Sequence, residues 1–382
     1  MTRVVLGVEV IRPPLTGTGR YALELATHLS ELDGIEDLRF FAGRKMVESP
    51  GDALSAPMLS LETRKRLAQS KIVLGAYRVL APLHKRMVLR AYAGYVFHGP
   101  NYYIPPFPGP AVATFHDLSI YKFPEHHPEP RVRYMQKEIP LALKRAAFLI
   151  TDSEATRREV VEYFGLPVSS VVAVPLASGG AFKPRSEVET RSVLERFGLT
   201  HGRYLLYVGT IEPRKNLGVL LDAYAGLPAV LRERYPLVLA GYRGWKSEAL
   251  LARIGQLRSR GMVHYLDYVE EENLPILFSG ARAFAYPSLY EGFGLPVLEA
   301  LGSGIPVVCS NATSLPEVAG DAALLVEGGD VDATRNALEK ALADESWRSL
   351  AIKLGLAQAS RFTWHETACK TLDVYNMALA KC

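Results

Sequence analysis

The chain has 382 residues, of which 48% are hydrophobic and 22% charged, and its formal net charge is +4. This length exceeds what one hydrophobic core usually supports, and the composition is that of an ordinary globular protein, so we expect two domains. The small net charge gives no support for a nucleic-acid-binding protein, which would carry a concentrated basic face.

Short apolar runs alternate with helix-length segments along most of the chain. Continuous apolar runs are typical of parallel strands that are buried on both faces. The predicted strands cover residues 4–10, 38–41, 95–98, 111–115, 148–151 and 171–174, then 204–208, 237–240, 263–267, 283–286, 306–309 and 323–326. The pattern therefore predicts an α/β protein with two Rossmann-like, doubly wound domains.

The boundary between the domains is expected where Gly179, Gly180 and Pro184 interrupt this pattern, in a linker over residues 178–187. We expect an N-terminal domain over residues 1–178 and a C-terminal domain over residues 187–362. A last helix over residues 363–382 is long enough to cross back to the first domain. Since ligands bind beyond the carboxyl ends of parallel strands, the cleft between the domains is the expected site.

The chain enters its first predicted strand directly, without the charged and apolar segments of an export signal. No apolar run approaches the roughly 18 residues that span a bilayer, so we expect a cytoplasmic protein. Residues 64–90, RKRLAQSKIVLGAYRVLAPLHKRMVLR, interleave basic and apolar residues at roughly helical spacing. This segment is either a solvated helical excursion of the first domain or an amphipathic surface that contacts anionic lipid.

A Gly17-Thr18-Gly19 turn follows the first strand and leads into a helix that is expected to start near Gly19 or Arg20. Backbone N–H groups at such a helix start can approach an anion or a sugar hydroxyl. The full G-x-G-x-x-G pattern is absent, so a dinucleotide site is poorly supported. The alternative is a tight turn with only a structural role.

Two further strand ends carry candidate functional side chains. His116 follows the strand over residues 111–115, where its ring either serves a ligand or is hydrogen-bonded by neighbouring backbone. Arg214 and Lys215 follow the strand over residues 204–208 and precede a helix that should begin near Asn216. Two cations beside a helix N-terminus suit a diphosphate, and the alternative is two solvated loop charges.

The segment SLYEGFGLPVLEALGSG predicts a strand end, a glycine-rich loop and a helix with Pro296 in its first turn. Glu291 lies in the loop and Glu299 near the start of the helix, so both carboxylates should point into the cleft. The alternative is a solvated Glu291 and a Glu299 that is merely favoured by the helix dipole. Asp330 and Asp332 precede another helix and are expected to cap it rather than bind a metal.

Residues 288–327, SLYEGFGLPVLEALGSGIPVVCSNATSLPEVAGDAALLVE, closely resemble the E-x7-E core of the retaining glycosyltransferases of family 4, which have the GT-B fold. The segments GTGRYALEL, TFHDLS, TDSEATRREV, VGTIEPRKNL and FTWHETA resemble the other blocks of that family, in the expected order. The resemblance covers nearly the entire chain. It implies two Rossmann-like domains that face each other across a cleft, with the acceptor on the N-terminal domain and the nucleotide-sugar donor on the C-terminal one.

The resemblance also implies roles for the candidate residues. Arg214 and Lys215 would hold the donor diphosphate, and Glu299 would accept hydrogen bonds from the ribose. Glu291 would contact the transferred hexose, and His116 would hydrogen-bond it from the other domain. The remaining residues expected around the donor and the reaction centre are Gly17, Gly19, Gly292, Phe293, Gly294 and Leu295. No metal and no cofactor other than the nucleotide-sugar co-substrate is implied.

The combination of GTGRY, HGPNYY, TFHDLS and SLYEGFGLPVLEA most resembles mannosyl- and rhamnosyltransferases of bacterial O-antigen (lipopolysaccharide) synthesis. This implies a GDP-sugar donor, GDP-mannose or a GDP-deoxyhexose such as GDP-rhamnose. The acceptor would be a polyprenyl-diphosphate-linked glycan at the inner face of the cytoplasmic membrane, where residues 64–90 would dock peripherally. The alternatives are a UDP-sugar-dependent transferase of the same family and a non-catalytic nucleotide-sugar-binding partner of a transferase.

Overall fold

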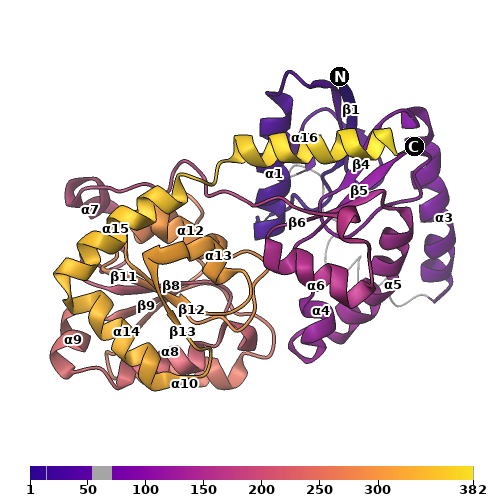
Figure 1. The fold of residues 1–382 in the computed structure, drawn as a ribbon. Helices are drawn as coiled ribbons and strands as arrows, with labels where there is room; N and C mark the ends of the chain where they lie inside the picture. The colour runs from indigo at the N-terminus through magenta and orange to yellow at the C-terminus, as the bar shows by residue number, and fades with distance from the viewer. Residues whose placement is uncertain (14, 54–70, 382) are drawn as a thin grey trace.

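The chain folds into two lobes, each built on its own β-sheet (Figure 1). The computed structural model describes residues 1–13, 15–53 and 71–381, with the backbone alone for residues 71–79. In this part of the chain the first sheet has the order β3-β2-β1-β4-β5-β6-β7 and the second the order β10-β9-β8-β11-β12-β13. All neighbouring strands are parallel except β2 and β3.

The strands agree closely with the expected runs, each of which overlaps one. Those of the first sheet are β1 (Thr2–Gly7), β2 (Ile35–Phe41), β3 (Met46–Val47), β4 (Val96–Gly99), β5 (Ala111–Phe115), β6 (Phe148–Thr151) and β7 (Val171–Ala173). Those of the second are β8 (Leu205–Val208), β9 (Leu237–Ala240), β10 (Val263–Asp267), β11 (Ala283–Tyr286), β12 (Val307–Ser310) and β13 (Ala323–Val326). The expected α/β class is therefore confirmed. The short antiparallel edge strand β3 was not predicted, because two residues carry no readable period.

Helices cover both faces of each sheet. The first lobe contains α1 (Gly17–Ser30), α3 (Lys71–Leu89), α4 (Ser119–Lys122), α5 (Glu129–Arg145) and α6 (Glu154–Phe164). The second contains α7 (Glu187–Arg196), α8 (Leu217–Ala225), α9 (Ala229–Arg234), α10 (Glu248–Ser259), α11 (Leu274–Ser279), α12 (Leu295–Gly302), α13 (Leu315–Ala319), α14 (Val331–Ala343) and α15 (Glu345–Ala359). Short 3₁₀ helices are η1 (Pro50–Ala53), η2 (Arg90–Tyr92), η3 (Pro124–His126), η4 (Val168–Ser170), η5 (Pro213–Lys215) and η6 (Gly320–Ala322).

The last helix, α16 (Trp364–Ala380), lies on the first lobe beside α1 (Figure 1, yellow). Its side chains bond to the first sheet, since the Thr2 hydroxyl donates to Asn376 at 2.6 Å and the Tyr375 hydroxyl lies 2.6 Å from Nδ1 of His98. The chain therefore passes between the lobes twice, once after β7 and once after α15.

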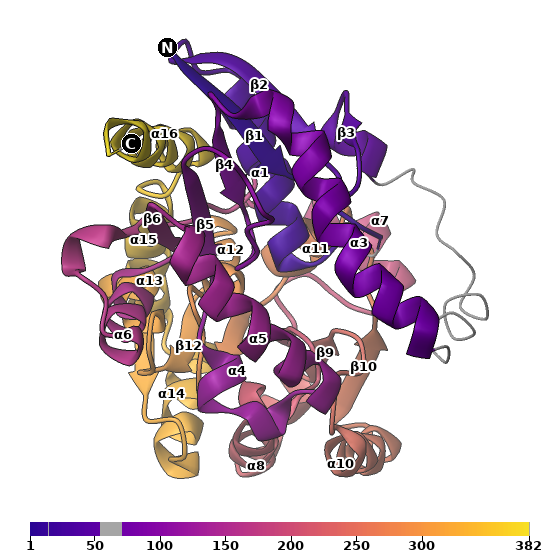
Figure 2. The same cartoon turned by 90° about the vertical axis from the view of Figure 1, so that its right-hand side faces the viewer.

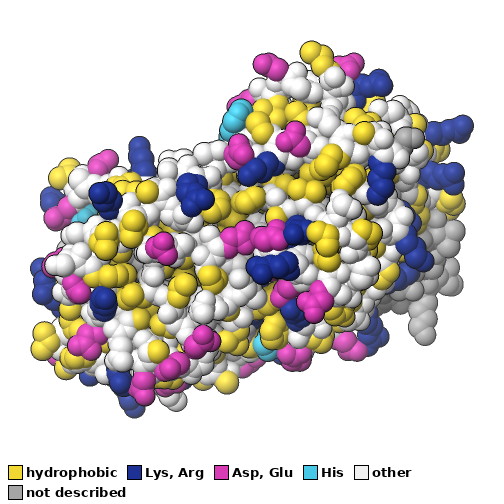
Figure 3. Space-filling view, viewed as in Figure 1, with side chains coloured by type: hydrophobic (Ala, Val, Ile, Leu, Met, Phe, Trp, Pro, Cys, Tyr) yellow, Lys and Arg dark blue, Asp and Glu magenta, His cyan; other side chains and the backbone are white. Residues whose placement is uncertain are grey.

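The first sheet is buried on both faces, as its continuous apolar strands predict. Val4 and Leu6 face a core that includes α1 and α16, whereas Val5 between them belongs to a second core shared with α5 and α6. This alternation follows from the period of two along a strand. The carboxyl ends of the strands are thereby held rigidly where the lobes meet. Figure 3 shows acidic and basic side chains close together along this junction.

The basic segment over residues 64–90 is only partly described. Residues 64–70 lie outside the described part of the chain, and residues 71–89 form α3 on the outside of the first lobe (Figure 2). Toward its C-terminal end α3 exposes Leu80, Leu83 and Met87. None of the described helices is long and apolar enough to cross a membrane.

Candidate active site

Lys215 and Glu291 form a buried ion pair where the second sheet faces the cleft. Lys215 ends the short helix η5 after β8, and Glu291 lies in the loop after the neighbouring strand β11. Lys215 Nζ lies 2.6 Å from Glu291 Oε1 and donates to the Tyr286 hydroxyl at 2.9 Å. Burial alone would raise the pKa of Glu291, but the charges of Lys215 and Arg214 hold that pKa below its usual value. Glu291 is therefore ionised at neutral pH.

Arg214 extends this charge cluster to the first lobe. Its guanidinium donates to the Tyr290 carbonyl at 2.8 Å and to Glu212 at 3.0 Å. The same group lies 3.7 Å from Glu291 and 3.7 Å from Asp117, which follows β5 of the first lobe. Two cations at one spot can hold an anion, and the surrounding carboxylates fix them in place. A bound diphosphate would share these cations with the carboxylates.

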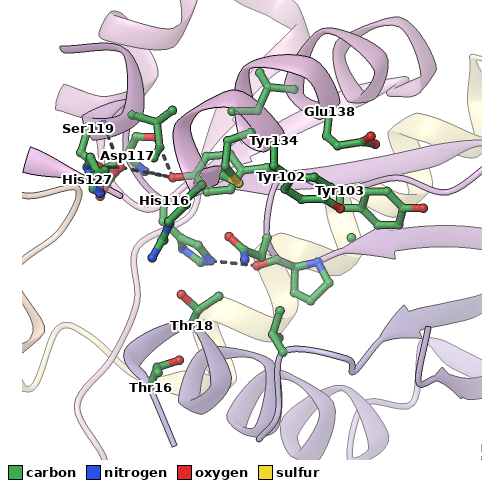
Figure 4. A pocket seen from close by; sticks show the side chains of 18 of the residues that line it. Thr16, Thr18, Tyr102, Tyr103, His116, Asp117, Ser119, His127, Tyr134 and Glu138 are labelled. Atoms are coloured by element: carbon green, nitrogen blue, oxygen red, sulfur yellow. Dashed lines mark hydrogen bonds between the residues drawn. The ribbon is translucent and has the colours of Figure 1, made fainter. Parts of the chain in front are cut away.

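His116 also lies at the cleft (Figure 4), but both of its ring nitrogens already have partners. Nδ1 is 2.7 Å from Asp152 Oδ2, and Nε2 is 2.8 Å from the Pro100 carbonyl oxygen. A carbonyl only accepts, so Nε2 carries a proton and donates it. Burial alone would lower the pKa of His116. Asp152 and the Pro100 carbonyl together outweigh burial and hold that pKa above its usual value. The expected hydrogen bond to a hexose would require Nε2 to leave Pro100.

The backbone of the glycine-rich loop after Glu291 lies close to the backbone of the first lobe at His116. A Cβ atom on Gly292 would lie 1.7 Å from the His116 carbonyl oxygen, so only glycine fits there. The Gly292 carbonyl accepts hydrogen bonds from Ser153 at 2.7 Å and from Thr156 at 3.0 Å, at the start of α6. The loop thus reaches the first lobe through its backbone.

The other loop residues have mainly structural surroundings. Gly294 has a φ of 110°, a left-handed conformation that favours glycine at the start of α12. Phe293 is buried and its ring lies 5.8 Å from that of Phe362. Leu295 is the first residue of α12 and packs partly buried against the main core.

Glu299 lies apart from the Lys215–Glu291 pair and has a partner of its own. Its Oε1 lies 2.5 Å from Nη1 of Arg20, on α1 of the first lobe, and Nη2 of Arg20 lies 2.6 Å from Glu271. Burial raises the pKa of Glu299 to about 7, although Arg20 acts in the opposite direction. The expected ribose-binding carboxylate is therefore engaged by the opposite lobe.

We expected α1 to start near Gly19 or Arg20, after the glycine turn. This expectation was wrong, because the helix starts about two residues earlier and includes the turn. The helix begins at Gly17, because the Thr16 side chain caps it by accepting from the Gly19 backbone N–H at 3.3 Å. A Cβ on Gly19 would meet the Leu15 side chain at 2.9 Å, whereas Gly17 has open space beside it. Gly19 thus has the structural role and Gly17 leaves the helix start accessible.

A cavity of about 650 Å³ connects these elements across the cleft. Thr16 and Thr18 line it from the start of α1. His116 and Asp117 line it from the loop after β5 (Figure 4). Arg214 and Lys215 line it from the second lobe. The cavity therefore brings the expected cations and the expected histidine to one solvent-accessible space.

Several residues of the site were not predicted. Asp152 follows β6, which pairs with β5, so its position next to His116 could have been found from adjacent strand ends. Arg20 and Glu212 carried no comparable signal. Asp330 caps α14 by accepting from the Ala333 N–H at 2.8 Å, as expected, whereas Asp332 lies inside the first turn of α14 and pairs with Arg335 at 2.9 Å. Within the described ranges no group of three histidine, cysteine or acidic residues could hold a metal ion.

Comparison with known proteins identifies relatives along the whole chain. The model of the family "Glycosyl transferases group 1" matches residues 195–356. The O-antigen chain mannosyltransferase B of Escherichia coli is 42% identical over 379 residues, which cover 98% of this chain and 100% of that protein. The serotype-specific mannosyltransferase WbdA of Escherichia coli is 34% identical over 282 residues, which cover 71% of this chain and 34% of that protein.

Solved structures share the arrangement of both lobes. The sucrose-phosphate synthase of Thermosynechococcus elongatus matches with a TM-score of 0.74 at 20% identity and covers 100% of both chains. The Anabaena HepE protein in complex with UDP and glucose matches with a TM-score of 0.73 at 16% identity, over 98% of this chain and 100% of that one. At such identities the likeness concerns the fold alone.

Proposed function

This chain belongs to the group 1 glycosyl transferases and has the GT-B fold, and from that premise we propose that it transfers mannose from GDP-mannose to a lipid-linked glycan in O-antigen synthesis. The observation that carries the reaction is the cluster of Arg214, Lys215 and Glu291 at the strand ends of the second lobe. The choice of mannose is supported by the relative that is 42% identical over its full length and is named as a mannosyltransferase.

In the proposed reaction the bond between the anomeric carbon and the donor β-phosphate breaks. Negative charge then grows on the phosphate, where Lys215 and Arg214 stabilise it without needing to reorganise. The anomeric carbon becomes positively charged, and the ionised Glu291 offsets that charge. The acceptor hydroxyl attacks from the face that the phosphate leaves, which retains the configuration, and its proton passes to the departing phosphate. This scheme includes neither a metal nor a further cofactor, because side-chain cations meet the charge of the leaving group.

The proposed donor site uses residues of both lobes. The ribose hydroxyl groups would donate hydrogen bonds to Glu299. Arg20 would then either leave this carboxylate or bind it together with the ribose. The open space beside Gly17 and the first N–H groups of α1 would allow the sugar to approach the helix start. His116, which is hydrogen-bonded to Asp152, would lie at the same cavity near the reaction centre.

The acceptor is proposed to be a polyprenyl-diphosphate-linked glycan at the inner face of the cytoplasmic membrane. On α3, the exposed side chains of Leu80, Leu83 and Met87 recur with the spacing of one helical face, and Arg86 and Arg90 are exposed beside them. Apolar side chains flanked by cations favour an anionic membrane surface. We expect the double variant Leu83→Glu/Met87→Glu to sediment less with vesicles that contain phosphatidylglycerol. Unchanged sedimentation would contradict this docking.

A panel of nucleotide sugars tests the proposed function. GDP-mannose, GDP-rhamnose, UDP-glucose and dTDP-rhamnose would each be incubated with the protein, with and without glycolipid acceptors that end in mannose or N-acetylglucosamine. Release of nucleoside diphosphate that increases with acceptor, from GDP-mannose alone, is the expected result. Stimulated release from a UDP-sugar would instead establish the UDP-dependent alternative. No release from any donor would indicate a non-catalytic nucleotide-sugar-binding protein.

A further inference from the structure

The carboxylate of Glu9 also belongs to the lining of this cavity and has no role in the reaction described above. Glu9 lies in the segment between β1 and α1, at the carboxyl end of the first sheet. Its Oε2 atom is buried and has no hydrogen-bond partner in the described part of the chain. Buried polar atoms in folded proteins usually have such a partner, because leaving one unpaired costs free energy. An unpaired carboxylate oxygen beside a cavity therefore indicates that a ligand supplies the donor.

Burial holds the pKa of Glu9 above its usual value, although the nearby charges of Lys85 and Arg12 act in the opposite direction. The ammonium group of Lys85 donates to the Tyr103 hydroxyl at 3.1 Å and lies 4.5 Å from the centre of the same ring. Lys85 thus contacts Tyr103 next to the cavity, and Glu9 is among the residues that line the same cavity.

The wall next to Glu9 has the chemistry of a sugar-binding site. Tyr103, Tyr134 and Glu138 lie together on the side of the cavity away from Thr16 and Thr18 (Figure 4). Aromatic rings offer apolar faces for the carbon skeleton of a pyranose, and carboxylates accept hydrogen bonds from its hydroxyl groups.

The position of Glu9 favours the acceptor over the donor. Arg214 and Lys215, the proposed diphosphate ligands, come from the second lobe, whereas Glu9 and its neighbours come from the first. A further cavity of about 700 Å³ between α3 and α5 shares Lys85, Tyr103, Tyr134 and Glu138 with the first. Residues beside the proposed sugar site thus also line a second cavity between α3 and α5, which offers room for the rest of a lipid-linked glycan.

We propose that Glu9 accepts hydrogen bonds from hydroxyl groups of the terminal acceptor sugar and so orients the attacking hydroxyl toward the donor. This inference rests on the proposed function. Glu9 acts here in acceptor binding and not as the base, because the proton of the attacking hydroxyl leaves with the phosphate.

The test compares full-length wild-type protein with Glu9→Gln and Glu9→Ala, using GDP-mannose and the glycolipid that stimulates the wild type most. We expect kcat/KM for the acceptor to fall about 10-fold in Glu9→Gln and about 10- to 100-fold in Glu9→Ala, mainly through KM, because a hydrogen bond to a charged group is lost. Slow release of GDP without acceptor should not change, since the donor site is intact. Glu162→Gln, which removes an exposed carboxylate on α6, is the matched control and should behave as the wild type.

The possible results separate the two proposals. An unchanged acceptor KM in both Glu9 variants, while the wild type transfers mannose, would overturn the role of Glu9 and leave the proposed function standing. A fall in kcat at saturating acceptor, with KM unchanged, would also overturn it and would identify Glu9 as a base. A wild type that shows no acceptor-stimulated release would overturn both proposals.

Discussion

Arg20 and Glu299 join the two lobes through an ion pair of 2.5 Å. The pair connects α1 of the first lobe to α12 of the second, and Arg20 also reaches Glu271 at 2.6 Å. The side chain of Glu299 is only 6% exposed, so this carboxylate has little contact with water that could replace Arg20. The residue proposed to hold the ribose thus also holds the lobes together in the protein without donor.

Arg20→Ala should destabilise the protein by about 1–3 kcal/mol at pH 8, because it leaves Glu299 buried without its cation. Urea denaturation of the wild type and the variant measures this loss. The double variant Arg20→Ala/Glu299→Gln should lose less than the sum of the single variants, since both remove the same interaction. Arg133→Ala, which breaks an exposed pair with Glu129 on α5, is the control and should cost less than about 1 kcal/mol. If Arg20→Ala and Arg133→Ala lowered the free energy of unfolding equally, the Arg20–Glu299 pair would contribute little to stability.

Glu299 should also make stability depend on pH. Its pKa of about 7 in the folded protein lies above the ordinary value of 4.5, so the folded state binds this proton more tightly than the unfolded state does. The contribution of Glu299 to stability therefore falls as pH rises from about 4.5 to 7 and is constant above that range. Relative to Glu299→Gln, the wild type should lose about 2 kcal/mol between pH 5.5 and pH 8 in urea unfolding experiments. Parallel pH profiles for the two proteins would contradict the raised pKa.

The strands followed from the sequence because buried parallel strands leave a continuous apolar signal. The same argument placed Lys215 and Glu291 at strand ends of one sheet. Their direct pairing was not foreseen, because spacing along the chain does not show which side chains meet across neighbouring loops. Arg20 could not be found either, since its partners Glu299 and Glu271 come from the other lobe. Contacts between lobes depend on how two folded sheets dock, and local patterns carry no information on that.

Gly292→Ala tests the close contact between the lobes. The added Cβ would overlap the His116 carbonyl oxygen and force the loop away from Ser153 and Thr156. Because small displacements of reacting groups are costly, we expect mannosyl transfer to fall about 100-fold. Gly255→Ala on α10 adds the same atom where nothing lies within 4 Å, and it should leave activity unchanged. Full activity in Gly292→Ala would mean that this contact is absent during turnover.

Glu291→Ala should abolish most transfer while circular dichroism shows an intact fold. The variant removes the carboxylate that offsets positive charge at the anomeric carbon, and it leaves Lys215 without its ion-pair partner. Glu291→Gln keeps the size of the side chain and removes only the charge, so it separates these effects from packing. If either variant transferred mannose as fast as the wild type, Glu291 would be a structural residue alone.

Lys215, beside Arg214, is proposed to stabilise the charge that grows on the departing diphosphate. The decisive measurement is kcat/KM of Lys215→Ala for transfer from GDP-mannose to the glycolipid acceptor. We expect a fall of roughly 10²–10³-fold, the usual effect of removing one group that stabilises a developing negative charge. A variant that retains near wild-type turnover would contradict the assignment of the cation cluster to the diphosphate.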